Sequence, residues 1–406
     1  MILVALSKVK LMEITATTFI KNAATTAEYF GFQSIQTLKN SPACKSCLTR
    51  LAHTDTAQDR KTDALYGLLT GGMQTYCDAR LQEITEPLLF YTIDQVPRTG
   101  EAALSLHVFN VNKSIAKATL IQASRAIVGD LGYEQNRVRI NSLGDKESSI
   151  RYTRELTNYF RKRLEEMPEI ARELMKEHVM LALAHLVEKE HDLAYRSPNP
   201  LEYLSDPSRK HFREIVEFLD MAGINYEIDP KLIGHHECYS DALFAIDLLD
   251  EDQTIMPNSP LLIRGGCYSE FVSRNTKQNI AAVGAVVILK DSKSPARLPK
   301  AKLAVPTVYV VQLGFGPKIK SLILIDQLRR SGVIVFQNLA SDSLSTQLRD
   351  AEAKGVKYVV IIGQKEFVEN SVILRDMDAR SQEQVSLDQL PAKLKRTQDR
   401  ATTKTA

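Results

Sequence analysis

Residues Asn225 to Ile246 read NYEIDPKLIGHHECYSDALFAI, and the rest of the chain is organised around this stretch. Hydrophobic residues alternate through Tyr226 and Ile228, an Asp-Pro pair interrupts them, and a second apolar segment starts at Cys238. This pattern predicts a strand, a tight connection and another strand. With an apolar strand on each side, the connection should lie at the mouth of a sheet, where ligand sites form.

The connection is dense in side chains that can bind ligands. They are His235, His236, Glu237, Cys238 and Tyr239. Adjacent residues on an extended chain point to opposite sides, so at most two of these side chains could converge on a metal ion. A remodelled ligand pocket, a metal site and an ordinary polar loop remain alternative interpretations. A Cys-His nucleophile pair is disfavoured because no third orienting group is evident.

The overall composition bounds the class of protein. At 406 residues the chain should hold two domains, and its net charge of +3 is too small to indicate a nucleic-acid partner by itself. We find neither an apolar stretch near the ~18 residues of a membrane span nor a signal-peptide pattern. The five cysteines, an odd number, favour reduced thiols over a disulfide framework. We therefore expect a cytoplasmic protein without a membrane segment.

One group of cysteines has the spacing of a partial zinc site. Cys44 and Cys47 are separated by two residues, and His53 and Cys77 follow. Two sulfurs at this spacing can hold one tetrahedral metal ion, but zinc needs four ligands and the second pair lacks such spacing. Free thiols are the favoured interpretation, with zinc as the alternative.

The order of predicted elements suggests the domain organisation. Strands are expected at 87–96, 104–111, 137–141, 261–263 and 281–289, and helices at 114–131, 206–222 and, as one long stretch, from 145 to about 190. From Val305 strands and helices alternate, which predicts a parallel sheet covered by helices. We expect a core at 1–290 with a helical insertion at about 145–195, a linker at 291–304, a second domain at 305–395 and a disordered tail at 396–406.

Several segments resemble the histidyl-tRNA synthetases, a family of class II aminoacyl-tRNA synthetases. INSLGDKE, from Ile140, is similar to a strand-turn-helix of the family core. LEYLSDPSRKHFREIVEFLDMAGINYEIDPKLI, from Leu201, is similar to the segment before its histidine-specific motif, and SLSTQLRDAEAKGVKYVVIIGQKE, from Ser343, to its anticodon-binding domain. Thr17 to Leu38 is similar to its dimer-forming helix and strand. The resemblance implies a homodimer with an α+β class II synthetase-like core, an antiparallel sheet with helices, followed by a small α/β anticodon-binding-like domain.

The resemblance also shows where the arginines of the family are missing. The family uses arginines because a planar cation stabilises the charge that builds up when a carboxylate attacks the α-phosphate of ATP. By our alignment the matching positions are near Ile93 and at Gly234, Cys267 and Asp291. One missing donor costs about 10²–10³ in rate, and an aspartate facing phosphate would repel the nucleotide. These replacements predict that amino-acid activation is lost.

We therefore predict a pseudoenzyme that serves as a binding or regulatory module for tRNA, a histidine-like ligand or a protein partner, without a cofactor. The alternative is a divergent but active histidine–tRNA ligase that uses ATP and Mg²⁺. Its catalytic site would use Arg98, Arg264, Lys290 or the two histidines, His235 and His236. A regulatory subunit of a biosynthetic enzyme is a second alternative, by analogy with the synthetase-like subunit of ATP phosphoribosyltransferase. That relative usually lacks the C-terminal domain.

Two sets of residues are candidates for binding. The expected ligand pocket contains His235, His236, Glu237, Tyr239, Gly265, Gly266 and Tyr268. The expected RNA-contacting residues, on one side of the C-terminal domain, are Lys318, Lys320, Arg329, Arg349 and Lys365. A simple turn is the alternative reading of the two glycines, and solvating surface charge is the alternative reading of the five cations.

Overall fold

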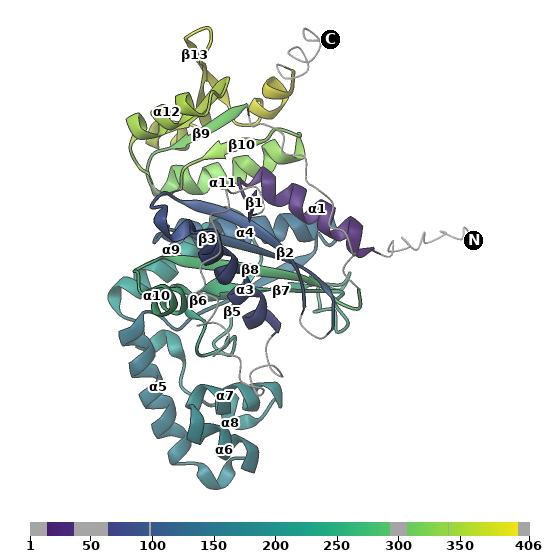
Figure 1. Cartoon of the computed structure of the whole chain (residues 1–406), viewed down its shortest axis with the longest axis vertical. Coiled ribbons are helices and arrows are strands. Elements are labelled where there is room, and N and C mark those ends of the chain that lie inside the picture. The colour runs from purple at the N-terminus through teal and green to yellow at the C-terminus, as the bar shows by residue number, and fades with distance from the viewer. Residues whose placement is uncertain (1–13, 36–63, 97–98, 293–306, 340, 397–406) are drawn as a thin grey trace, which may run out of the picture.

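The protein, described by a computed structural model, contains two β-sheets with helices packed against both. The structure describes residues 14–35, 64–96, 99–292, 307–339 and 341–396. In Figure 1 the larger sheet occupies the middle of the molecule, a helical insertion extends from one end, and the C-terminal domain lies at the other end.

The larger sheet has eight strands, and its centre is antiparallel. Their order is β1-β2-β3-β8-β7-β6-β4-β5, and only the edge pairs β1-β2 and β4-β5 are parallel. The strands are β1 (Gln33–Ser34), β2 (Leu88–Gln95), β3 (Ala102–Phe109), β4 (Asn136–Ser142), β5 (Tyr226–Ile228), β6 (Ser240–Leu248), β7 (Leu261–Cys267) and β8 (Ala282–Leu289). This arrangement confirms the predicted antiparallel core.

The two strands predicted on either side of the connection both form, but they are not neighbours in the sheet. Strand β4 lies between β5 and β6. The connection is therefore a loop over residues 229–239 that passes the end of β4. Asn141 of β4 holds this loop, because its side-chain amide donates hydrogen bonds to the carbonyl oxygens of Pro230 and Leu232.

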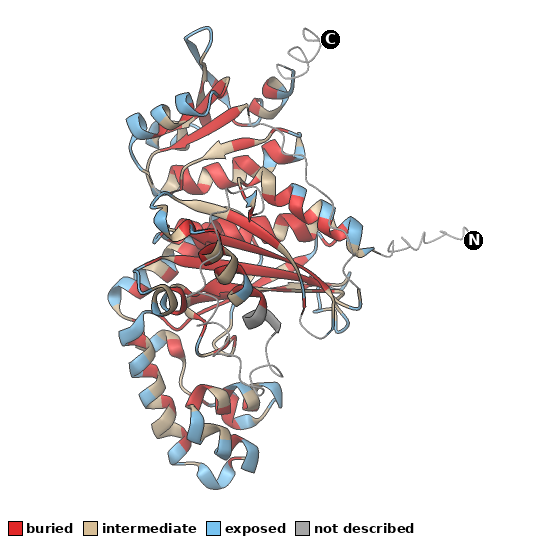
Figure 2. Ribbon diagram, in the orientation of Figure 1, coloured by how far each residue is buried: buried red, intermediate tan, exposed pale blue. Residues whose placement is uncertain are grey.

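Helices cover both faces of this sheet. One face carries α1 (Ala16–Tyr29), α4 (Ser114–Asp130) and α9 (Asp206–Met221), and the other carries α3 (Ala64–Asp78) and α10 (Ser269–Thr276). A short 3-10 turn, η3 (Leu81–Glu83), follows α3. Figure 2 shows the sheet as almost entirely buried between these layers. We refer to the two sides as the α4 face and the α3 face.

The predicted long helix after β4 is broken into several pieces. These are α5 (Lys146–Arg161), η4 (Leu164–Glu166), α6 (Glu169–Glu177), α7 (Val179–Glu188), α8 (Asp192–Tyr195) and η5 (Pro200–Tyr203). One break falls at Pro168, immediately before α6, because proline lacks the N–H that a helix interior needs. His178 then has extended backbone angles and caps α7 by accepting a hydrogen bond from the Met180 N–H.

The C-terminal domain contains a five-stranded mixed sheet. Its order is β10-β9-β11-β12-β13, with the first three strands parallel and the last two antiparallel. The elements are β9 (Val308–Gln312), α11 (Phe315–Arg330), β10 (Val335–Gln337), α12 (Leu344–Ala353), β11 (Tyr358–Ile362), α13 (Gln364–Val368), β12 (Ser371–Asp376) and β13 (Ser381–Ser386), and a helix covers 390–396. The parallel part was predicted; the antiparallel pair was missed because β13 is polar and mostly exposed.

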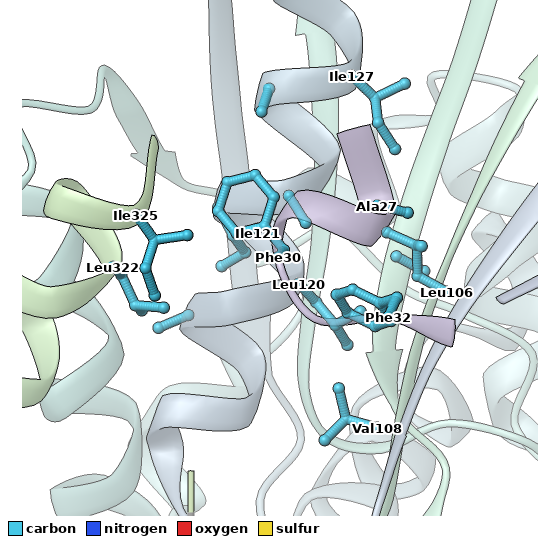
Figure 3. Packing of buried hydrophobic residues seen from close by; sticks show 14 of the residues in the cluster. Ala27, Phe30, Phe32, Leu106, Val108, Leu120, Ile121, Ile127, Leu322 and Ile325 are labelled. Carbon is cyan, nitrogen blue, oxygen red and sulfur yellow. The ribbon is translucent and has the colours of Figure 1, made fainter. Parts of the chain in front are cut away.

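The two domains share one hydrophobic core. Figure 3 shows Leu322 and Ile325 of α11 beside Ile121 of α4 and Phe30, which follows α1. Buried ion pairs reinforce the contact, since the Arg329 guanidinium on α11 reaches the carboxylate of Asp130 at the end of α4. Helix α11 therefore fixes the C-terminal domain on the α4 face. Most of the predicted linker and nearly all of the predicted tail lie outside the described residues.

Candidate functional site

The predicted ligand-binding loop places its histidines in a stack of aromatic rings. The His236 ring lies 4.4 Å from that of His178 and 5.1 Å from that of His235. The His235 carbonyl oxygen accepts hydrogen bonds from the backbone N–H groups of Cys238 and Tyr239, which forms a tight turn. Glu237, at the tip of this turn, is exposed and does not face the same space as Tyr239, which is buried.

The space around this loop and the two glycines is nearly filled. A cavity of about 20 Å³ is lined by Gly234, Tyr239, Arg264 and Gly265 together with apolar neighbours. Such a volume is enough for one water molecule and too small for histidine or a nucleotide. Within the described residues, the predicted pocket therefore does not form as an open site.

The glycines here accommodate aromatic side chains of the protein. A Cβ atom at Gly234 would lie 2.3 Å from the Tyr239 ring, and one at Gly266 would lie 2.8 Å from the same ring. A Cβ atom at Gly265 would lie 2.5 Å from the ring of Phe244. Both Gly265 and Gly266 belong to β7, so the glycine pair is part of a strand and not the turn considered as an alternative.

The centre of the α3 face is packed with aromatic rings. Tyr76 of α3 stacks on Phe109 with ring centres 4.2 Å apart, and Phe90 stacks on His107 at 4.9 Å. The hydroxyl of Tyr268 shares a 2.7 Å hydrogen bond with His107 Nδ1. Tyr268, predicted to line a ligand pocket, is thus a fully buried part of this cluster.

His107 is the least expected residue of the cluster. It is completely buried, and burial lowers the pKa of His107 to about 3, so the imidazole is neutral at physiological pH. Helix α3 passes directly over the ring, because a Cβ atom at Gly72 would lie 2.3 Å from His107 Nε2. The adjacent glycines Gly71 and Gly72 in the sequence are the one signal that could have indicated such a close approach.

The central strands supply no charge to the α3 face. All eight residues of β3 and all eight of β8 are buried, and neither strand contains a charged residue. Arg264 of β7 is the one arginine or lysine in strands β2, β3, β7 and β8. It is half-buried beside the small cavity and has no ion pair among the described residues.

The other predicted catalytic groups do not gather around Arg264. Arg264 pairs with Val286 of β8, and Lys290 follows Val286 by four residues. Because a strand rises about 3.3 Å per residue, Lys290 lies about 13 Å from Val286 along the strand. Asp291 follows in an exposed turn with φ 56°, where its N–H donates to the Glu101 carboxylate. We expected Asp291 to face phosphate, and this was wrong because the chain turns away from the sheet. Arg98 lies outside the described residues.

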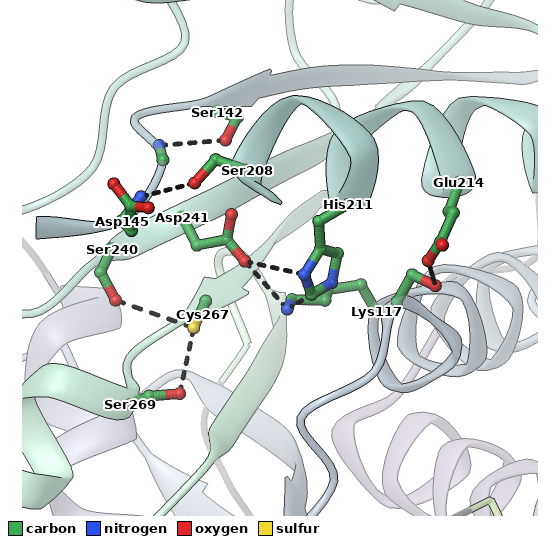
Figure 4. Close-up of polar contacts among 12 residues, drawn as sticks. Lys117, Ser142, Asp145, Ser208, His211, Glu214, Ser240, Asp241, Cys267 and Ser269 are labelled. Carbon is green, nitrogen blue, oxygen red and sulfur yellow. Dashed lines mark hydrogen bonds and ion pairs between the residues drawn. The ribbon is translucent and has the colours of Figure 1, made fainter. Parts of the chain in front are cut away.

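The opposite, α4 face carries a buried charge cluster that the sequence did not reveal (Figure 4). The Lys117 ammonium lies 3.0 Å from the Asp241 carboxylate and 2.9 Å from His211 Nε2. Burial disfavours the charges of this ion pair, but each charge stabilises the other, which raises the pKa of Lys117 and lowers that of Asp241. Burial and the Lys117 charge lower the pKa of His211. These residues tie α4, α9 and β6 together.

Cys267 borders this cluster and does not reach the α3 face. Its sulfur lies 3.1 Å from the Ser269 hydroxyl and 3.7 Å from that of Ser240 (Figure 4). Side chains alternate between the two faces along β7, so Tyr268 and Cys267 point to opposite sides. The position that resembles a family arginine therefore holds a thiol packed against helices.

The predicted RNA-contacting residues divide into two groups. Lys318 and Arg329 are buried, where Lys318 pairs with Asp342 at 2.6 Å and Arg329 pairs with Asp130 and Asp326. The expectation that all five face one side was wrong, because these two side chains are buried in ion pairs. Arg329 pairs across the domain interface with Asp130, and Lys318 pairs with Asp342 of its own domain. Lys320 is half-buried, and Arg349 and Lys365 are exposed.

The metal prediction falls mostly outside the described residues. Cys77 is a buried cysteine on α3, whereas Cys44, Cys47 and His53 lie in the part of the chain that is not described. Among the described residues no group of three or more potential ligands could hold a metal ion. The zinc alternative therefore stays a prediction.

ATP with Mg²⁺ is the group that the family resemblance implies, and the described residues do not fit it. A triphosphate needs several cationic donors that converge. The α3 face offers Arg264 alone, beside a cavity of about 20 Å³. We therefore derive no reaction step through ATP.

The fold defines the class of protein. An antiparallel sheet with helices on its α4 face, followed by a separate mixed α/β domain, is the arrangement of a class II aminoacyl-tRNA synthetase. The family described as "Anticodon binding domain" matches residues 308–397. The anticodon-binding match and the similarity to curated histidine–tRNA ligases support a relationship to the histidyl-tRNA synthetase family.

Those relatives are the histidine–tRNA ligases of Fervidobacterium nodosum and a Geobacillus species. The first is 27% identical over 279 residues, which cover 68% of this chain and 65% of that protein. The second is 26% identical over 307 residues, which cover 74% and 71%. The chain thus spans about two thirds of the length of the curated relatives that it matches. The solved apo histidyl-tRNA synthetase of S. aureus is 17% identical with a TM-score of 0.44, covering 80% of this chain and 81% of that one. No helix among the described residues has the length and apolar character to cross a membrane.

Proposed function

We propose that this chain has lost amino-acid activation and serves as an RNA-binding module of the histidyl-tRNA synthetase family. One observation carries the proposal: the α3 face is filled by the rings of Tyr76, His107, Phe109 and Tyr268. An adenylate would have to displace this cluster, and the uncharged strands β3 and β8 would offer its phosphates no partner.

The C-terminal domain supports RNA as the ligand. Residues 308–397 match an anticodon-binding family, and Arg349 and Lys365 are exposed on this domain. We propose that these two cations contact RNA phosphates and that the chain forms a homodimer, as the class II resemblance of its first helix implies. We also propose a cytoplasmic location, because the odd number of cysteines favours reduced thiols.

ATP–pyrophosphate exchange with histidine, repeated with the other amino acids, tests the loss of activation. We expect no exchange above background from protein that is folded by circular dichroism. Size-exclusion chromatography with light scattering on the same sample reports the oligomeric state. Exchange at an ordinary enzymatic rate would overturn the proposal, and a monomer would overturn the proposed dimer.

A divergent histidine–tRNA ligase is the second candidate. The names of the curated relatives favour it, as does Arg264 beside the small cavity, which has no ion pair with any residue that the structure describes. In this case ATP binding would have to open the α3 face around Arg264. Arg264→Ala should then abolish exchange, whereas Arg151→Ala, at an exposed position of α5, should leave it unchanged.

A further inference from the structure

Helix α5 lines a groove of about 610 Å³. Figure 1 shows α5 descending along the side of the molecule from the larger sheet to the helical insertion. The α5 side of the groove is polar, and its charged and hydroxyl-bearing members are Lys146, Ser149, Thr153, Arg154, Thr157 and Arg161. These positions recur every three or four residues, so they form one stripe along the helix.

The three cations of this stripe have no ion pair among the described residues. Lys146, Arg154 and Arg161 are all exposed. At the rise of an α-helix they are spaced by about 12 Å and 10 Å, so the stripe is roughly 22 Å long. Arg151 lies on the same helix outside the groove, and its guanidinium lies 3.8 Å from the Glu147 carboxylate. The groove thus holds three positive charges without an ion pair among the described residues, while the cation beside it has a partner.

Two residues from other elements complete the groove. They are His178 at the start of α7 and Glu270 in α10, the one acidic residue of the lining. The His178 ring is held in place by its stack on His236 and by the hydrogen bond that its Nδ1 accepts from the Met180 N–H. The groove therefore combines a row of cations with a fixed aromatic ring.

We propose that the α5 groove binds single-stranded RNA, with phosphates on Lys146, Arg154 and Arg161 and a base against the His178 ring. Unpaired cations in a row attract a phosphate backbone, and bases of single strands stack on aromatic side chains, including histidine. A groove of this volume has the size of a small-molecule site, which accommodates a few unstacked nucleotides and not a duplex. The inference rests on the proposed function as an RNA-binding module. It places a second contact at the end of the molecule away from the C-terminal domain.

Fluorescence anisotropy with full-length protein and a labelled oligoadenylate, over a series of salt concentrations, tests this site. The variant Lys146→Ala/Arg154→Ala/Arg161→Ala should bind at least 10-fold more weakly. The slope of the logarithm of its binding constant against the logarithm of salt concentration should be smaller by about 2, because each lost phosphate contact removes about 0.7 from this slope. His178→Asn keeps a capping oxygen for α7 but removes the ring, and it should weaken binding about 5-fold or more. Arg151→Ala, the matched control on the same helix, should bind like the wild type. All changed cations are exposed, and circular dichroism verifies that each variant is folded.

The outcomes separate the groove from the proposed function. Equal binding by the triple variant and Arg151→Ala would overturn the α5 site and leave the RNA-binding function in place. Wild-type protein that binds unfractionated tRNA but not oligoadenylate would also overturn the α5 site and leave the RNA-binding function in place. Wild-type protein that binds neither RNA would overturn both. Competition by an RNA duplex or by dextran sulfate as strong as that by oligoadenylate would show a general polyanion surface and refute the single-strand site.

Discussion

Removing the charge of Asp241 should destabilise the fold more than any surface substitution. Asp241 lies in a β-bulge of β6 with φ 54°, a backbone conformation that asparagine also tolerates. Asp241→Asn therefore changes the charge and leaves the backbone and the shape nearly unaltered. The Lys117 ammonium, whose side chain is 4% exposed, would then be buried without its carboxylate.

The expected loss is about 3 kcal/mol in the free energy of unfolding. Breaking a buried ion pair by removing one partner costs about 3–5 kcal/mol, and the lower end applies because the asparagine oxygen and His211 can still accept hydrogen bonds from Lys117. A domain has only about 5–15 kcal/mol of stability, so urea unfolding followed by circular dichroism resolves this change.

The loss should also depend on pH in a defined direction. In the wild type the raised pKa of Lys117 means that the pair stabilises fully below about pH 10 and loses this contribution as pH rises through the folded-state pKa. In the variant, burial without a carboxylate should lower the pKa of Lys117 below its unfolded value, so stability rises with pH. The difference between the two proteins should therefore shrink from about pH 7 to about pH 10.

A matched control separates burial from charge. Glu147→Gln breaks an exposed pair with Arg151 and should cost less than about 0.5 kcal/mol. The reasoning is refuted if Asp241→Asn costs no more than this control, or if its cost stays constant as pH rises.

Three further substitutions test other features. Gly72→Ala should destabilise by about 1–3 kcal/mol because its methyl group would overlap the buried histidine of β3, whereas Gly71→Ala, with nothing within 4 Å, should stabilise by about 0.5–1 kcal/mol. Thermal unfolding measures both, and equal shifts would contradict the packing of α3. Arg329→Met, at a side chain 8% exposed, should cost about 3 kcal/mol and speed hydrogen exchange in α11, while Arg330→Met, 70% exposed, should change stability by less than about 0.5 kcal/mol. Burial alone would raise the pKa of Asp145, but hydrogen bonds from serine side chains and a backbone N–H lower it to about 2. The stabilisation by the ionised Asp145 carboxylate is present above about pH 4 and is lost as pH falls through about 2. Wild-type protein should therefore lose more stability than Asp145→Asn between these two pH values. Identical acid-unfolding profiles of the two proteins would disprove this role of Asp145.

Local patterns were enough to predict most strands and helices, because β8 is a run of small and branched apolar residues, β3 is mostly apolar and α9 is amphipathic. The neighbours of each strand were not predictable in this way. Asn141 of β4 pairs with Leu243 of β6 across a hundred residues, and nothing near either strand indicates it. The placement of β4 between β5 and β6 was unpredictable for the same reason.

The candidate site was harder to predict than the fold. The His-His-Glu-Cys run looked like a ligand site because its side chains are polar, yet the loop turns so that His236 stacks on His178, a residue from a distant helix. The Lys117–Asp241 pair joins an ordinary helix to a strand end, and no motif relates the two. Side-chain packing across the sheet decides both cases, and such packing has no signature in local spacing.

The pairing of β3 with β8 has a consequence for how the chain folds during its synthesis. Phe109 pairs with Ala282, so the ribosome must make residues 110–281 before the centre of the larger sheet can form. Helices α5 to α8 contact mainly one another and can form while synthesis continues. Until β8 emerges, β3 and β7 each present an unpaired edge of apolar residues, which is the kind of surface that chaperones cover and that aggregation exploits. A nascent chain that stalls shortly before Ala282 should therefore be the most aggregation-prone intermediate of this protein.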